Sequence, residues 1–147
     1  MAASPDFRGG VYVASGDIDG DGTSDIITGL GTGGQPQVTI FSGATGAVLS
    51  RFSAFQAEFT GGVTVAASDL TGDNVPDIIT GMASGGGLVR VYDGATFAPL
   101  YTLAPFGSSF TGGVSLAHIA IPEPSTALML FTGAALALGR GRRGACR

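Results

Sequence analysis

Four aspartates within nine residues could hold a metal ion in the first part of the chain. Residues 17–25 follow the pattern D-x-D-x-D-G-x-x-D. Calcium takes about six to eight oxygen ligands, and carboxylates at positions 1, 3 and 5 of a tight loop can converge on one ion. Gly22 permits the sharp turn that this requires. We therefore predict a Ca2+ site whose ligands are Asp17, Asp19, Asp21, Asp25 and the backbone carbonyl of Thr23.

A second loop, residues 69–77, keeps aspartate at positions 1, 5 and 9. It has Thr71 at position 3 and Asn74 at position 6, where asparagine tolerates the left-handed conformation. Because a hydroxyl is a poorer calcium ligand than a carboxylate, we predict a weaker Ca2+ site here. Its predicted ligands are Asp69, Thr71, Asp73, Asp77 and the backbone carbonyl of Val75.

The loops also resemble two other kinds of structure. An EF-hand begins similarly, but it needs a glutamate at position 12 and flanking helices; position 12 is Thr28, and the flanks alternate like strands. An Asp/Gly-rich turn without metal is the other alternative, since these residues favour turns for backbone reasons alone. Four neighbouring carboxylates would repel one another without a cation, which favours the metal site.

Both loops belong to an internal repeat. The pattern F-x-G-G-V begins at Phe7, Phe59 and Phe110, at spacings of 52 and then 51 residues. The pattern D-I-I-T-G follows at Asp25 and at Asp77. Such self-similarity at a fixed period is the signature of a repeat architecture. The predicted units are repeat 1 (7–58), repeat 2 (59–109), a partial third repeat (110–120) and a tail (121–147).

Each repeat is predicted to form four short strands, because β-branched and aromatic residues alternate between glycine-rich turns. A four-stranded unit of this length is typical of a β-propeller blade. A propeller ring needs about four to eight blades. We therefore predict an all-β fold, a partial β-propeller of two four-stranded blades plus an extra strand at 114–119, with a C-terminal hydrophobic helix. The blade strands are expected at 10–15, 26–30, 37–41, 48–52, 62–67, 78–82, 88–92 and 100–103.

The Asp loop followed by Asp25-Ile26-Ile27 and a glycine-rich turn resembles the FG-GAP, or VCBS, repeats of integrin α-like propellers. The resemblance covers residues 7–119. It implies calcium sites in the loops between the first and second strands of each blade. It also implies that the assembled propeller serves adhesion or the recognition of proteins and glycans.

The tail has three parts in order: Pro122-Glu123-Pro124, an apolar stretch, and an arginine cluster. The prolines end the preceding fold before a helix begins. Residues 126–139 would span about 21 Å as a helix, less than the roughly 30 Å of a hydrocarbon core. Arginines at its end are expected to stay cytoplasmic, which places the repeats outside. The residues that define the tail are Pro122, Glu123, Pro124, Arg140, Arg142 and Arg143.

This tail resembles the PEP-CTERM sorting signal of Gram-negative bacteria. The resemblance implies recognition and cleavage near the Pro-Glu-Pro motif by a membrane exosortase. It also implies anchoring in the inner membrane through the tail, followed by release to the cell surface or the extracellular space. The alternative is a C-terminal core helix of a soluble protein. A helix that is apolar all round needs burial that two blades do not supply.

The charge pattern argues against nucleic-acid binding. Residues 1–121 carry three arginines and ten carboxylates, a net charge of -7, which favours cations over phosphates. His118 and Cys146 are single residues without a catalytic context, so we expect no enzyme. Residues 1–10 lack the basic start and apolar core of a secretory signal. Because a protein with this tail should be exported, we expect that the chain is truncated or that its start was wrongly assigned.

These observations predict a calcium-binding, exported bacterial surface or extracellular-matrix protein that is non-catalytic and processed at its C-terminus. Two alternatives stay open. The repeats could be the scaffold of a larger secreted enzyme, or the chain could be a truncated gene remnant.

Overall fold

The computed structural model describes residues 7–117 of the 147-residue chain. These residues form two four-stranded antiparallel sheets, and no helix is assigned among them. In this part of the chain there is accordingly no helix with the length and apolar character needed to cross a membrane. The first sheet contains β1 (Val11–Gly16), β2 (Asp25–Leu30), β3 (Gln37–Phe41) and β4 (Val48–Ser53), and the second contains β5 (Val63–Ser68), β6 (Asp77–Met82), β7 (Val89–Tyr92) and β8 (Pro99–Leu103).

Each sheet is a meander whose strands pair in chain order. The two sheets share one register, since Val13 pairs with Thr28 in the first and Val65 pairs with Thr80 in the second. Both have a register shift at the end of the third strand. Because side chains alternate between the faces of a strand, a shared register puts equivalent residues on equivalent faces. The sequence repeat is therefore a structural repeat.

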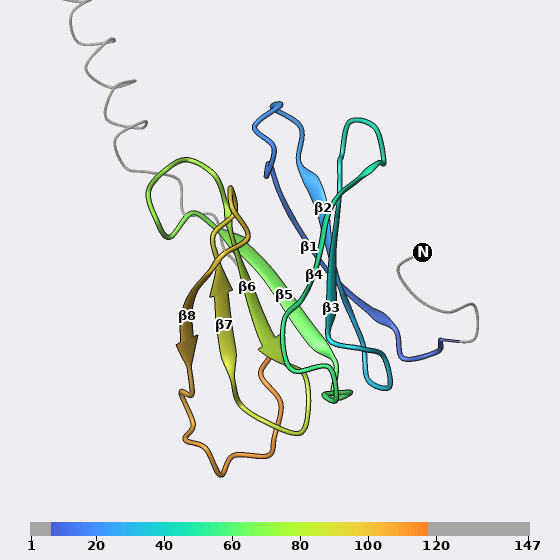
Figure 1. The fold of residues 1–147 in the computed structure, drawn as a ribbon, viewed down its shortest axis with the longest axis vertical. Coiled ribbons are helices and arrows are strands. Elements are labelled where there is room, and N and C mark those ends of the chain that lie inside the picture. Colours follow the sequence, from blue (N-terminus) through green and yellow to red (C-terminus); the bar gives the residue numbers. More distant parts are fainter. Residues whose placement is uncertain (1–6, 118–147) are drawn as a thin grey trace, which may run out of the picture.

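The two sheets pack face to face, with β5 lying against β1 and β2 (Figure 1). The core between them contains Ile27 and Ile40 from the first sheet and Val63 and Ile78 from the second, all fully buried. Burying one such side chain contributes about 1.5–3 kcal/mol. The interface between the sheets is thus the main hydrophobic core of the described residues.

The glycines of the F-x-G-G-V pattern allow the second repeat to start close to the first. A Cβ atom at Gly62 would lie 2.9 Å from the backbone nitrogen of Thr32 in repeat 1, so a larger residue does not fit there. The N–H of Gly33 donates to the carbonyl of Thr60 at 2.8 Å, and the hydroxyl of Thr32 donates to the carbonyl of Gly61 at 3.3 Å. The start of repeat 2 is thereby tied to the β2–β3 loop of repeat 1.

A polar and aromatic contact reinforces the interface beyond β4. The carbonyl of Ala54 accepts hydrogen bonds from the hydroxyl of Tyr92 at 2.7 Å and from Nη1 of Arg90 at 3.0 Å. The Arg90 guanidinium lies 5.4 Å from the centre of the Phe55 ring, within the range of a cation–π interaction. The rings of Phe52 and Tyr92 lie 4.7 Å apart. Donors and rings of the second sheet therefore hold the end of the first.

The predicted all-β class is confirmed, and all eight predicted blade strands are found with ends that differ by at most one residue. The extra strand predicted at 114–119 differs, because no strand is assigned up to residue 117. The N–H of Val114 donates to Met82 at 2.8 Å, but its carbonyl accepts from the Thr64 hydroxyl at 2.9 Å, so no strand ladder continues from it. Residues 118–119 and the predicted C-terminal helix lie outside the described residues, and the propeller stays a prediction.

Candidate metal centre

The two Asp-rich loops connect equivalent strands. The first joins β1 to β2 and the second joins β5 to β6, and both lie at the same end of the two sheets, at the top of Figure 1. Most residues in the middle of each loop are exposed, but each loop ends in a buried aspartate at the start of the following strand, and Ile18 of the first loop is also buried. The sheets therefore fix both ends of each loop and leave its middle open to solvent.

In the first loop, three of the predicted ligands come together. One carboxylate oxygen from each of Asp17, Asp19 and Asp21 lies within 4.8 Å of the other two. Backbone N–H groups orient these side chains: Asp17 Oδ1 accepts from Gly20 at 2.9 Å, and Asp17 Oδ2 accepts from Gly22 at 2.9 Å. Asp19 and Asp21 each accept one further backbone N–H of the loop. The loop backbone thus turns three anionic groups toward one point.

The fourth predicted ligand, Asp25, is placed differently. It is fully buried, and its Oδ2 accepts from the N–H groups of Ile18 at 2.8 Å and Asp19 at 3.3 Å. Its Oδ1 accepts from the N–H of Gly43 at 2.9 Å, in the β3–β4 turn. Asp25 therefore links the start of its own loop to a neighbouring turn. Its role as a calcium ligand stays a prediction.

The second loop repeats this arrangement with one carboxylate fewer. Asp69 accepts from Gly72 at 2.6 Å and from Asn74 at 2.9 Å, as Asp17 does in the first loop. The buried Asp77 accepts from the N–H groups of Leu70 and Thr71 and from Gly94 in the β7–β8 turn, as Asp25 does. The loop backbone is thus conserved between the repeats although Thr71 replaces an aspartate.

The turn residues support this equivalence. Gly22 has φ +86°, and Asn74, at the same position of the second loop, has φ +69°. Asparagine is one of the few non-glycine residues that visit this left-handed region readily. Both loops therefore have a left-handed residue at position 6, where Asn74 replaces the glycine.

The remaining predicted ligands contribute backbone contacts to the loops. The N–H of Thr23 donates to Asp21 Oδ1 at 2.7 Å, and the N–H of Val75 donates to Asp73 Oδ1 at 2.9 Å. These hydrogen bonds place the two residues beside the carboxylates. Coordination by their carbonyl groups and by the Thr71 hydroxyl stays a prediction.

The electrostatics of the second loop favour an anionic side chain at its first position. The backbone N–H of Gly72 is the main cause that lowers the pKa of Asp69 below its ordinary value of 3.8, and the N–H groups of Asn74, Asp73 and Thr71 add to it. Hydrogen bonds donated to a carboxylate stabilise its charged form. Asp69 therefore carries a negative charge at neutral pH.

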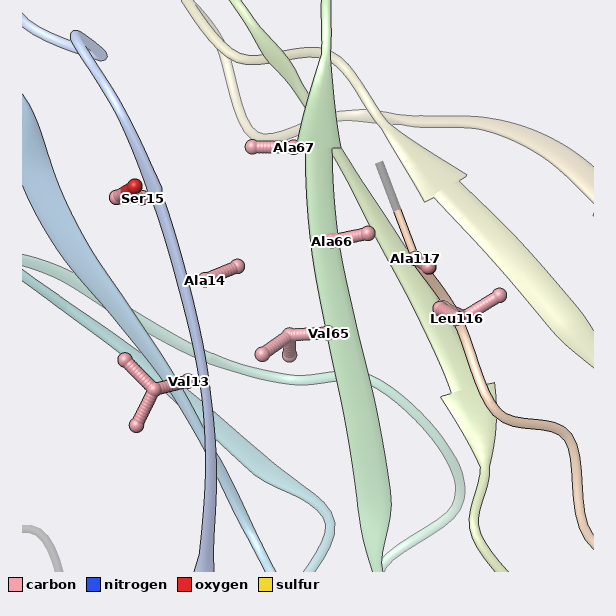
Figure 2. A pocket seen from close by; sticks show the side chains of 8 residues that line it. All are labelled: Val13, Ala14, Ser15, Val65, Ala66, Ala67, Leu116 and Ala117. Carbon is pink, nitrogen blue, oxygen red and sulfur yellow. The ribbon is translucent and has the colours of Figure 1, made fainter. Parts of the chain in front are cut away.

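Two cavities lie away from the Asp loops. One, of about 280 Å3, lies between β1, β5 and residues 116–117; among its eight lining residues the only polar side chain is that of Ser15 (Figure 2). The other, of about 300 Å3, is lined by Phe55, Gln56, Glu58, Phe59, Met82, Leu88 and Arg90. Neither lining contains a pair of carboxylates or a nucleophile beside a base.

Our sequence interpretation missed the contact of Arg90 with Phe55 and Ala54. Arg90 is a single cation inside an apolar strand, and only the packing of the second sheet on the first brings it to these residues. No local pattern indicates such a pair. The predicted sorting residues Pro122, Glu123, Pro124, Arg140, Arg142 and Arg143 lie outside the described residues, as do His118 and Cys146.

Comparison with known proteins identifies the tail. The family model of the PEP-CTERM protein-sorting motif matches residues 120–143. The match includes the Pro-Glu-Pro motif and three arginines of the terminal cluster. The comparison with curated proteins gave no match. The resemblance of residues 7–119 to FG-GAP repeats stays a prediction, since the matched model covers the tail alone.

Proposed function

Because the sorting motif implies an exported protein that is sorted at its C-terminus, we propose that residues 7–117 act outside the cytoplasm as a calcium-stabilised interaction module. The tail is associated with processing by an exosortase and with anchoring in the membrane. The two-sheet module would then be presented at the cell surface or in the extracellular matrix. Its ligand there would be a protein or a glycan.

The convergence of three carboxylates in the first loop is the observation that carries the calcium proposal. Two oxygens bound to one Ca2+ at about 2.3–2.6 Å each lie at most about 5 Å apart. The oxygens of Asp17, Asp19 and Asp21 satisfy this limit, since they lie within 4.8 Å of one another. This spacing is compatible with the shared binding of one calcium ion and supports the proposal.

A bound ion would neutralise the repulsion among these carboxylates and hold the loop in one conformation. In this proposal Asp17, Asp19 and Asp21 bind the ion directly. Asp25 holds the ends of the loop together through its three backbone contacts. In this proposal the role of the ion is structural, since the loop joins two paired strands of one sheet.

The second loop would bind calcium more weakly. Thr71 offers a neutral hydroxyl where the first loop has a carboxylate, and ligand charge is one of the properties that set the affinity of a calcium loop. The matching backbone contacts of Asp69 and Asp77 support a second site of the same shape. We therefore propose two sites of unequal affinity.

The side-chain inventory supports an interaction role over catalysis. Residues 7–117 contain no histidine and no cysteine. Most of their carboxylates belong to the two loops. The inter-sheet interface is apolar, and the exposed surface includes several large apolar side chains. Exposed apolar side chains that form a contiguous patch are typical of binding surfaces.

Calorimetric titration with Ca2+ tests the proposal, using the full chain in a mild detergent beside the double variant Asp17→Asn, Asp21→Asn. The matched control is Glu58→Gln, which removes one exposed carboxylate outside the loops. We expect binding in the micromolar to millimolar range, lost at the first site in the double variant and unchanged in the control. Absence of binding to the parent chain, or equal binding by the double variant, would contradict the calcium proposal.

The sorting proposal is tested separately. Glu123→Ala, in the centre of the Pro-Glu-Pro motif, should prevent C-terminal processing in a host that carries an exosortase, so the mass of the mature chain would increase. Glu58→Ala is the control and should be processed normally. Processing of the Glu123 variant at the usual rate would show that the exosortase does not recognise this motif.

A further inference from the structure

The open face of the first sheet has a buried counterpart in the second. We call Val11, Val13 and Ile26 the front face; they are 52%, 62% and 46% exposed. In Figure 2, Val13 points away from β5, whereas Val65, at the same position of β5, points toward β1. The equivalents of the front-face residues are all buried against the first sheet: Val63, Val65 and Ile78.

The second sheet shows the complementary pattern on its other side. We call Leu70, Leu103 and Phe106 the rear face; they are 54%, 53% and 59% exposed. Their equivalents in repeat 1 are Ile18, Phe52 and Phe55. Ile18 and Phe55 are buried in the interface, and Phe52 packs on the ring of Tyr92. Apolar side chains are thus exposed at each end of the stack, although Val89 and Val91, at the centre of the rear side, are buried.

We propose that the front face of one copy of this chain binds the rear face of a second copy, head to tail. The interface within the chain is the template, because there a front surface (Val63, Val65, Ile78) packs on a rear surface (Ile18, Phe52, Phe55). Each chain carries one further surface of each kind, in the same register. A second copy therefore supplies the complementary surface that each exposed face requires.

Such a contact is heterologous, since different surfaces of the two copies meet. Repeated contacts of this type close into a ring if the rotation allows it and otherwise continue as a filament. A closed ring of about four to eight four-stranded sheets would take about two to four copies if each contributed the two sheets of its described residues.

Part of the rear face is already covered by the chain itself. A Cβ atom at Gly81 would lie 3.4 Å from Leu116 Cδ1, and one at Gly29 would lie 3.0 Å from Val65 Cγ1. Leu116 therefore takes the place beside β6 that Val65 takes beside β2. The incoming β1 of a second copy would occupy this path, so residues 114–117 must be displaced when the copies associate.

The contact between copies should be weaker than the contact within the chain. Arg90 and Tyr92 donate to the end of the first sheet, at Ala54. The equivalent positions of the front face are Thr39 and Phe41, which lack the guanidinium and the phenol. We therefore expect reversible, concentration-dependent association.

The test uses two variants of the full chain in a mild detergent, Val13→Asp on the front face and Phe106→Asp on the rear face. Both side chains are exposed, so each variant should fold, which circular dichroism would check. By sedimentation velocity we expect the parent chain to associate as its concentration rises, and each variant alone to stay monomeric. Ala44→Asp, in the exposed β3–β4 turn, is the control and should associate like the parent.

Mixing the two variants distinguishes head-to-tail association from front-to-front and rear-to-rear association. One intact front and one intact rear remain in the mixture, so a 1:1 dimer should form although neither variant associates alone. Phe106→Asp leaves only the front face intact, so dimers of this variant alone would show that two front faces pair. Val13→Asp leaves only the rear face intact, so its dimers would show that two rear faces pair. Either result, or a parent chain that is monomeric at every concentration, would overturn the proposal.

Displacement of residues 114–117 has its own readout. Leu116→Ser weakens the hold of this segment on the rear face, so the variant should associate at a lower concentration than the parent chain. Weaker or unchanged association would overturn the displacement step.

Discussion

Asp25 Oδ1 accepts a hydrogen bond from the N–H of Gly43 at 2.9 Å, which joins the Asp-rich loop of the first repeat to the β3–β4 turn. The second repeat contains the same contact, from Gly94 to Asp77 at 3.1 Å. In both repeats the carboxylate is fully buried and accepts three backbone N–H groups in all. These two aspartates are therefore structural centres whether or not a metal is bound.

Replacing Asp25 should destabilise the fold in the absence of calcium. Asp25→Asn puts an amide NH2 group against backbone donors in a buried site, and we expect a loss of about 3 kcal/mol, because hydrogen bonds to charged groups contribute about 1.5–3 kcal/mol each. Urea unfolding in the presence of a chelator would measure it. Asp19→Asn, in the exposed part of the same loop, is the control and should change stability by less than about 1 kcal/mol.

Replacing each of two adjacent isoleucines by alanine should reduce stability in opposite order in the two sheets. Ile27→Ala removes a fully buried side chain and should cost about 3 kcal/mol, whereas Ile26→Ala, on the front face, should cost about 1 kcal/mol or less. In the second sheet Ile78→Ala should be the costly change, and Ile79→Ala the milder one. Thermal unfolding of the four variants at a concentration where the chain is monomeric would show this. The same order in both sheets would contradict the face assignment.

The hydroxyl of Tyr92 should contribute measurably to the contact between the sheets. Tyr92→Phe loses its 2.7 Å hydrogen bond to Ala54, and we expect a cost of about 1 kcal/mol. Arg90 still donates to the same carbonyl, so the double variant Tyr92→Phe, Arg90→Met should lose more than the two single losses added together. A double-mutant cycle measures this coupling. Additive losses would show that the two donors act independently.

The low pKa of Asp69 should make part of the stability depend on pH. A carboxylate with a pKa below its ordinary value of 3.8 in the folded chain contributes stability above the unfolded-state pKa, and this contribution is lost as the pH falls through the folded-state pKa. Asp69→Asn should therefore lower the melting temperature at pH 7 in a chelator, and the difference from the parent should shrink below about pH 3.8. A difference that persists undiminished at pH 2 would contradict this account. Glu58→Gln is again the control.

The strands were predictable from sequence because the repeat supplies each of them twice. The F-x-G-G-V and D-I-I-T-G patterns locate the first and second strands of both units, and glycine-rich turns delimit the others. Which face of a strand meets the other sheet was not predictable. Ile26 and Ile27 are adjacent and equally apolar, so alternation alone does not distinguish the residue that faces the core from the one on the front face.

The sequence predicts which aspartates belong to the candidate site. It does not predict which of them converge and which one accepts backbone hydrogen bonds instead. The spacing of the first loop brings Asp17, Asp19 and Asp21 together, as the structure shows. The spacing of the loop does not reveal that the oxygens of Asp25 accept three backbone N–H groups, one of them 18 residues away. That contact depends on how β3 and β4 return to β2, which is tertiary information. The placement of Leu116 beside Gly81 was not predictable either, because it also depends on tertiary structure.

Strand pairing in chain order also affects how the protein folds. Within each sheet every strand pairs with its neighbour in sequence, so the loops that must close are short and folding can be fast. Among the described residues, distant parts of the chain meet where the sheets pack on each other, as at Ala54 and Tyr92, and where Val114 returns to Thr64 and Met82. A chain that emerges from an export channel with its N-terminus first could therefore complete one sheet before the next arrives. The first sheet would then serve as the surface on which the second assembles, with few chances for strands to pair in the wrong order.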